Sequence, residues 1–129
     1  MKKFIDLVLR LIVAIILLQT LVYKFTAHPD SVYIFSALGV EPWGRIGLGV
    51  VELITSVLIL FGRTKLVGMI LSLGIILGAI GSHFLVIGIN VSGDGGTLFM
   101  LAIIVFVCSS IYLLLNKNNI GSLIKKLTN

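Results

Sequence analysis

Four long runs of apolar residues divide this chain of 129 residues. Each run has about the 20 residues that an α-helix needs to cross a lipid bilayer. The runs are apolar on nearly all faces, whereas the strands of a membrane barrel would alternate polar and apolar positions. Helices satisfy every backbone polar group of a span internally. The pattern therefore predicts an all-α membrane protein, a four-transmembrane-helix bundle with spans at about residues 4–23, 45–61, 66–89 and 97–115.

The segment between the first two spans is long for a bundle loop and too apolar for a solvated one. Pro29 suits the first turn of a helix, Asp30 complements the helix dipole there, and Gly39 suits a C-terminal stop. We expect a short interfacial helix, with a plain tether as the alternative to a moving lid. The predicted lid or mouth residues are Phe35, Trp43 and, in the loop between the last two spans, Asp94.

After the fourth span, residues 117–129 place apolar residues and lysines at helical spacing. This pattern is typical of an amphipathic segment that lies against the cytoplasmic leaflet. No linker separates any of these segments, so we treat residues 1–129 as a single domain.

Composition and charge agree with a membrane location. The chain is 58% hydrophobic and 12% charged, with a mean hydropathy of +1.19, which excludes an ordinary soluble globular protein. The formal net charge of +5 does not indicate a nucleic-acid partner, because threading the four spans up and down places most Lys and Arg residues on one side. By the positive-inside rule both termini are then cytoplasmic, and the lipid bilayer is the expected partner.

The chain has one cysteine, Cys108, and therefore no internal disulfide or CxxC motif. His83 is the only histidine within a span, so we expect no haem and no metal site. Redox chemistry would need a borrowed carrier, and we expect no intrinsic cofactor, with a quinone as the candidate ligand.

Glu52 is the most informative residue, because a carboxylate inside an apolar span is costly and needs a reason. Arg45, Gly49, Glu52 and Ser56 fall on one helical face, whose neighbours on the other faces are Ile, Leu and Val. This face is predicted to look toward protein rather than lipid.

His83 is the predicted partner of Glu52. At 1.5 Å per residue, Glu52 lies about 12 Å below Gly44 and His83 about 10 Å below Asn90, so the two side chains are at matching depths on adjacent helices. We expect a polar pocket in the outer half of the bundle. Its candidate residues are Glu52, His83, Arg45, Lys24 and Ser56. The alternative is a structural polar network that fixes helix register.

Toward the cytoplasmic side, Arg10 and Tyr112 are the candidate polar residues. Arg10 either extends to the headgroups or forms an inward ion pair. In the third span, Gly74 and Gly78 have GxxxG spacing, which predicts close approach of a neighbouring helix.

Several short motifs, taken in order along nearly the whole chain, resemble the DoxX family. They are Arg10, Lys24-Phe25, Phe35-x-x-x-Gly39-x-x-Pro42, Gly49-x-x-Glu52, Gly62 and His83. The resemblance implies a four-helix bundle in the bacterial cytoplasmic (inner) membrane. Relatives in this family include a small subunit of a thiosulfate:quinone oxidoreductase and components of thiol-stress complexes, and similar animal bundles act as assembly chaperones.

The resemblance implies an accessory subunit of a membrane redox system, quinone-linked or thiol-linked, with a membrane or soluble redox protein as partner. One alternative is a non-catalytic module that binds a lipid-like ligand or assembles with a membrane protein. Another is a small transporter or pore formed by a homo-oligomer. No residue is assigned as catalytic, and enzyme activity is left open.

Overall fold

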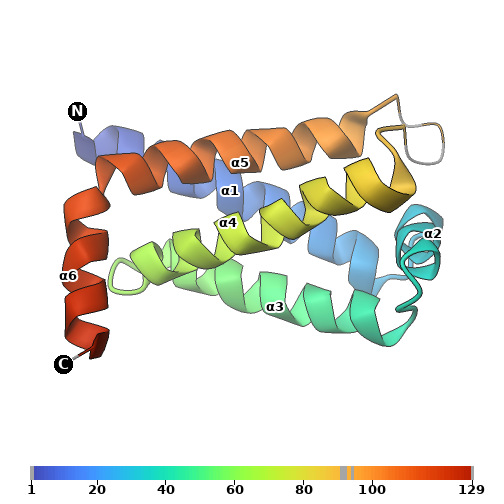
Figure 1. Cartoon of the computed structure of the whole chain (residues 1–129), viewed down its shortest axis with the longest axis horizontal. Helices are drawn as coiled ribbons and strands as arrows, with labels where there is room; N and C mark the ends of the chain where they lie inside the picture. The colour runs from blue at the N-terminus through green and yellow to red at the C-terminus, as the bar shows by residue number, and fades with distance from the viewer. Residues whose placement is uncertain (1, 91–92, 94, 129) are drawn as a thin grey trace.

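A computed structural model describes residues 2–90, 93 and 95–128, and all regular structure in these residues is helical. Four long helices lie side by side as a bundle (Figure 1). They are α1 (Lys2–Phe25), α3 (Trp43–Leu60), α4 (Lys65–Ser82) and α5 (Thr97–Leu115). Among the described residues, four helices are long and apolar enough to cross a membrane. The predicted all-α bundle is confirmed.

The fourth-span boundary was predicted closely, whereas the third span has an irregular end. After α4 the chain continues as one π-helical turn, η1 (His83–Ile87), and Gly88 then adopts a φ of 76°. Single π turns within α-helices are frequent at functional sites, and here the π turn follows α4 directly. This turn places His83 at the end of the bundle where the loop between α4 and α5 begins.

The short helix predicted between the first two spans is present as α2 (Pro29–Ala37) and lies across one end of the bundle (Figure 1). Pro29 occupies its first turn, and the ring Nδ1 of His28 accepts a hydrogen bond of 3.1 Å from the Asp30 backbone N–H. Gly39 follows the helix with a φ of 77°, in the left-handed region that glycine adopts at low cost. We call this end of the bundle the α2 end.

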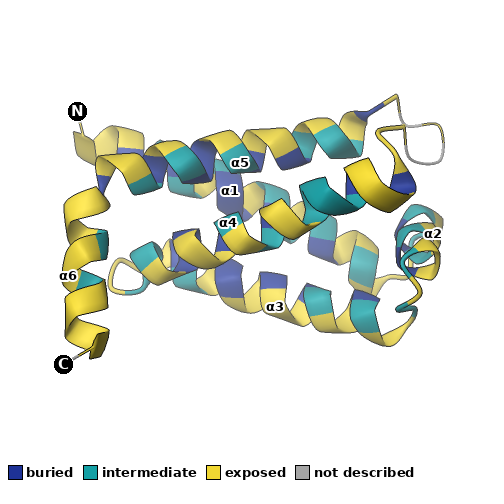
Figure 2. Cartoon of the chain, viewed as in Figure 1, coloured by how far each residue is buried: buried dark blue, intermediate teal, exposed yellow. Residues whose placement is uncertain are grey.

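The opposite end carries both chain termini and α6 (Lys117–Thr128), which crosses the bundle end (Figure 1). None of the described residues of α6 is buried, and Figure 2 shows the helix almost wholly exposed. The exposed apolar residues of α6 include Ile124 and Leu127. We call this end the α6 end.

The core is close-packed in the half of the bundle nearer the α6 end. Side chains from all four long helices are fully or almost fully buried there, among them Val13, Ile59, Met69, Val105 and Tyr112. The outward faces stay apolar and exposed, as Figure 2 shows, which suits contact with lipid.

The close approach of α3 and α4 depends on Gly68, where an added Cβ would lie 2.7 Å from the backbone N of Ile59. The GxxxG prediction was wrong, because an added Cβ at Gly74 or Gly78 would meet nothing within 4 Å. These two glycines face a cavity instead of a neighbouring backbone.

Candidate functional site

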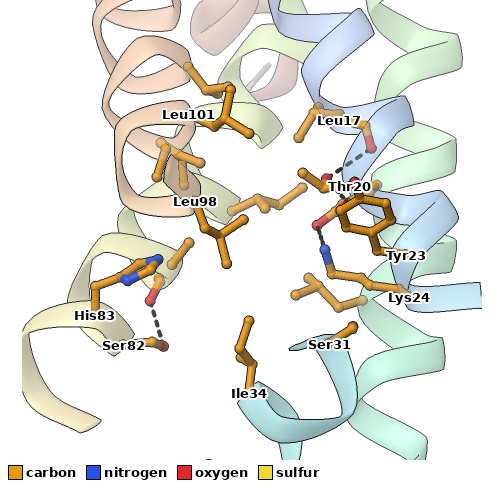
Figure 3. Close-up of a pocket in the computed structure, with 18 of the residues that line it drawn as sticks. Leu17, Thr20, Tyr23, Lys24, Ser31, Ile34, Ser82, His83, Leu98 and Leu101 are labelled. Atoms are coloured by element: carbon orange, nitrogen blue, oxygen red, sulfur yellow. Dashed lines mark hydrogen bonds and ion pairs between the residues drawn. The ribbon is translucent and has the colours of Figure 1, made fainter. Parts of the chain in front are cut away.

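A cavity of about 720 Å³ lies inside the bundle at the α2 end, between all four long helices, α2 and η1. Figure 3 shows its walls, with α1 and α2 on one side and α5 and η1 on the other. The polar residues along it include Thr20, Lys24, Ser31, Glu52, Ser82 and His83. Its deeper walls are apolar, with Ile16, Leu17, Ile76, Leu101, Ala102 and Val105.

Glu52 contributes a buried carboxylate to this cavity, with only 3% of the residue exposed. Its Oε1 lies 2.9 Å from the Nζ of Lys24, and its Oε2 accepts a hydrogen bond of 3.0 Å from the Thr20 hydroxyl. We call Lys24 and Glu52 the cavity ion pair. It joins α1 to α3, and the inward orientation predicted for the Glu52 face of α3 is confirmed.

His83, the predicted partner of Glu52, lines the same cavity as the carboxylate. Within the described part of the chain, no hydrogen bond joins the two side chains, and Lys24 holds the carboxylate instead. Figure 3 shows His83 across the cavity from Thr20 and Lys24. The depth argument correctly put both residues on one cavity, but they lie on different walls of it. The long lysine side chain reaches the carboxylate from α1.

His83 has a defined hydrogen-bond arrangement. Its Nδ1 lies 2.8 Å from the carbonyl oxygen of Gly88, and because a carbonyl only accepts, Nδ1 is the donor. The neutral ring then carries its acceptor at Nε2. The ring also packs edge-on against Phe99, with the ring centroids 5.3 Å apart. The π turn and Gly88 therefore fix one histidine tautomer at the cavity wall.

Arg45 and Ser56 support α3 rather than line the cavity. The Arg45 Nε lies 2.9 and 3.0 Å from the two carboxylate oxygens of Glu41, and its Nη1 donates to the backbone carbonyl of Lys24. The Ser56 hydroxyl donates to the backbone carbonyl of Glu52 over 2.8 Å. Both residues are buried.

Of the predicted mouth residues, Phe35 lines the cavity from α2, together with Ile34 and the residue that follows the helix, Leu38. Trp43 is 70% exposed and does not line it. Asp94 lies outside the described residues. A lid role for α2 therefore stays a prediction.

A second polar group lies at the α6 end, and we call Asp6, Arg10 and Lys65 the packed-end cluster. The Arg10 Nε lies 2.9 Å from Asp6, and its Nη1 donates to the Ile59 carbonyl over 2.9 Å. Lys65 approaches the same Asp6 oxygen at 3.4 Å. Of the two alternatives for Arg10, the inward ion pair is the one formed. The almost fully buried Tyr112 lies within electrostatic reach of Asp6 and Arg10.

The sequence analysis did not identify Thr20 as a partner of Glu52 or Asp6 as the partner of Arg10, although residue spacing offers a signal for both. Thr20 precedes Lys24 by four residues, and Asp6 precedes Arg10 by four, so each pair lies on one helical face. It also missed that Phe25 packs against Gly49, where an added Cβ would lie 2.8 Å from the Phe25 ring. Consecutive residues of α1 thus meet the glycine and the carboxylate of the Gly49-x-x-Glu52 motif.

No group of three or more His, Cys, Asp or Glu side chains that could hold a metal ion occurs in residues 2–90, 93 and 95–128. Cys108 is a free, buried cysteine of α5. The described part of the cavity therefore offers hydrogen bonds, the ion pair of Lys24 with Glu52, the partly exposed carboxylate of Asp30 and apolar surface.

In a comparison with protein families, the family model described as DoxX matches residues 5–88. The matched residues run from α1 to Gly88 and include Lys24, Glu52 and His83. No curated protein and no solved structure matches the chain.

Proposed function

The chain belongs to the DoxX family and is a multi-pass membrane protein, and from this premise we propose that it is an accessory subunit of a membrane redox system that holds a quinone in the α2-end cavity. The observation that supports this role most is the placement of the cavity ion pair on the wall of a largely apolar cavity. Ligand sites are commonly of about 300–1,000 Å³, mostly apolar, with a few polar groups that fix orientation.

The residues present fit a quinone headgroup. A quinone carbonyl needs a donor, and Lys24 has three N–H groups, of which Glu52 takes one. A quinol hydroxyl needs an acceptor, which the neutral His83 ring offers at Nε2. When bound, a quinone supplies two-electron, two-proton carrier chemistry. Lys24 would hold and orient the carbonyl end, Glu52 would keep Lys24 in place, and the apolar walls would exclude water.

The thiol-linked form of this role depends on a partner. Cys108 is the only cysteine and is buried, so the chain has no dithiol of its own. A membrane or soluble redox protein would have to supply the electrons, and such a partner is part of the proposal.

The proposed location is the bacterial cytoplasmic membrane, with the α6 end and both termini in the cytoplasm. The charge pattern supports this orientation, because most basic residues belong to the two terminal segments, to the turn between α3 and α4 and to the start of α4. They are Lys2, Lys3, Arg63, Lys65, Lys117, Lys125 and Lys126. In this orientation the cavity lies in the outer half of the bilayer.

The test is a titration of the purified full chain in nanodiscs with decylubiquinone. We expect saturable binding, weakened about tenfold, or about 1.4 kcal/mol, in Glu52→Gln. Glu41→Gln is the matched control, because Glu41 pairs with Arg45 and does not line the cavity. Absence of binding to the wild-type chain would overturn the quinone role.

A second candidate function is a non-catalytic module that binds a lipid-like ligand or assembles with a membrane protein. One observation favours it: the charges of Lys24 and Glu52 balance each other without any ligand, so the pair also stabilises the contact of α1 with α3. Under this function Glu52→Gln lowers stability and leaves recovery of a fixed partner from gently solubilised membranes unchanged. Loss of the partner in Glu52→Gln, with quinone binding intact, would contradict it.

A further inference from the structure

We propose that the α2-end cavity selects neutral amphiphiles with an oxygen-bearing head, and that the cavity ion pair enforces this choice by charge balance. The inference rests on the proposed ligand-binding role of the cavity and concerns which molecules the site accepts. A quinone is one member of the class. Long-chain alcohols, acylglycerols and polyprenols are others.

The charge argument begins with the cavity ion pair. Lys24 and Glu52 are opposite charges 2.9 Å apart, with side chains only 12% and 4% exposed, so together they present no net charge to the cavity. A buried charge without a partner carries a large desolvation cost. An anionic head beside Lys24 would also meet Glu52, and a cationic head beside Glu52 would also meet Lys24. Neither charge therefore finds a free counter-ion.

Among the described residues, Asp30 is the remaining charged residue on the cavity wall. Its side chain is 44% exposed, and its carboxylate lies 3.9 Å from the Nδ1 of His28. An exposed carboxylate is screened by solvent and contributes little net attraction. It does not change the balance set by Lys24 and Glu52 deeper in the cavity.

The distribution of polar groups gives the ligand its direction. Thr20, Lys24, Ser31 and Ser82 contribute polar atoms at the α2 end, and Lys24 has two N–H groups beyond the one taken by Glu52. The deeper walls, such as Val105, are apolar. An oxygen acceptor on the ligand is therefore expected at the α2 end and its hydrocarbon tail toward the middle of the bundle.

Gly74 and Gly78 provide the space for that tail. Both line the cavity, and an added Cβ at either would meet nothing within 4 Å. A larger side chain here would extend into the cavity without displacing protein atoms. Gly81 is also free of contacts within 4 Å but does not line the cavity, so it is the matched control position on the same helix.

The experiment uses three probes with the same ten-carbon chain: monodecanoylglycerol, decanoate and decylammonium. Affinity of the full chain in neutral detergent is taken from the concentration dependence of the unfolding midpoint, since a ligand that binds the folded state raises it. We expect the neutral probe to bind about tenfold tighter than either ion, a difference of about 1.4 kcal/mol. Gly78→Leu should abolish this binding and Gly81→Leu should preserve it.

Charge variants give the sharper result. Glu52→Gln leaves Lys24 without its counter-ion and should move the preference to decanoate, whereas Lys24→Gln should move it to decylammonium. Should Lys24→Gln fail to fold, the order of the three probes on the wild type and on Glu52→Gln still decides the question.

The outcomes separate the two proposals. Equal affinity for the three probes, sensitive to Gly78→Leu, would overturn charge selection and leave a ligand-binding cavity. Neutral selection without decylubiquinone binding would support the inference and overturn only the quinone role. No stabilisation by any probe or by decylubiquinone would overturn both.

Discussion

The cavity ion pair and the packed-end cluster each hold a carboxylate inside the bundle, but they differ in redundancy and surroundings. Within the described residues, Asp6 of the packed-end cluster has two cations, Arg10 and Lys65. In the same set of residues, Glu52 has one cation, Lys24, and the Thr20 hydroxyl. The first group adjoins a close-packed core, and the second lines a cavity.

This difference separates two uses of buried charge. A carboxylate with two cations next to a filled core stabilises the contacts of α1 with its neighbours and leaves no space for a ligand. A carboxylate with a single cation beside a cavity leaves N–H groups for an incoming acceptor. Buried ion pairs by themselves are weak evidence of stability, so the surroundings indicate the role.

The largest expected effect comes from removing the single cation. Lys24→Met leaves Glu52 buried without a counter-ion, which should lower the unfolding free energy by about 3–5 kcal/mol. Adding Glu52→Gln should recover most of the loss, because no charge then remains. Reversible unfolding in mixed micelles measures both. A loss below about 1 kcal/mol in Lys24→Met would show that the cavity compensates the carboxylate, and the contrast in redundancy would fail.

The next largest effect compares the packed half of the bundle with the half that holds the cavity. The same substitution, glycine to leucine, is made at two positions of α4. Gly68→Leu places atoms against the Ile59 backbone and should cost about 3 kcal/mol by overpacking. Gly78→Leu projects into the cavity and should change stability by less than about 1 kcal/mol, helped by better helix propensity. The unfolding midpoint in detergent is the measurement. Equal losses at both positions would contradict the division into a packed and a hollow half.

Redundancy in the packed-end cluster predicts a smaller loss from Arg10→Met than from Lys24→Met. Lys65 still approaches Asp6, while the hydrogen bond to the Ile59 carbonyl is lost, so we expect about 1–2 kcal/mol. Lys65→Met alone should cost about 0.5 kcal/mol, because its side chain is partly exposed. The double variant should lose more than the sum of the two single variants. Simple additivity would show that the two cations do not substitute for each other.

The smallest effect concerns a neutral polar contact in the packed half. The hydroxyls of Ser72 and Ser109 lie 2.8 Å apart, are fully buried and join α4 to α5. Ser72→Ala should cost about 0.6 kcal/mol, the average for such bonds between membrane helices. Unfolding in mixed micelles checks it, and a cost near that of Lys24→Met would place the hydroxyl pair on a level with the ion pairs.

The fold was predictable because each of its helices is indicated by residues that are close together in the sequence. Runs of spanning length, the Pro29 start and the Gly39 stop each depend on neighbouring residues, and the structure confirms the elements they predict. The burial of Glu52 was predictable for the same reason, since the face of a helix follows from its spacing.

The partner of Glu52 was not predictable from depth alone. Depth made His83 a candidate, but the choice between His83 and Lys24 depends on how each helix is rotated and on the reach of a lysine side chain. The size and shape of the cavity could not be predicted from the sequence either, because they depend on how side chains of several helices pack in three dimensions. GxxxG spacing at Gly74 and Gly78 is compatible with either a close helix contact or an open wall, and here the wall is open.

Lys24 is held from two directions by residues of one helix. Arg45 donates to its backbone carbonyl, and Glu52, two turns further along α3, binds its ammonium group. A slide of α1 along α3 would strain both contacts at once. We therefore expect α1 and α3 to keep a fixed alignment and to move as one rigid unit. Any change in the volume of the cavity then comes from displacement of α2, α4 and α5 relative to this unit.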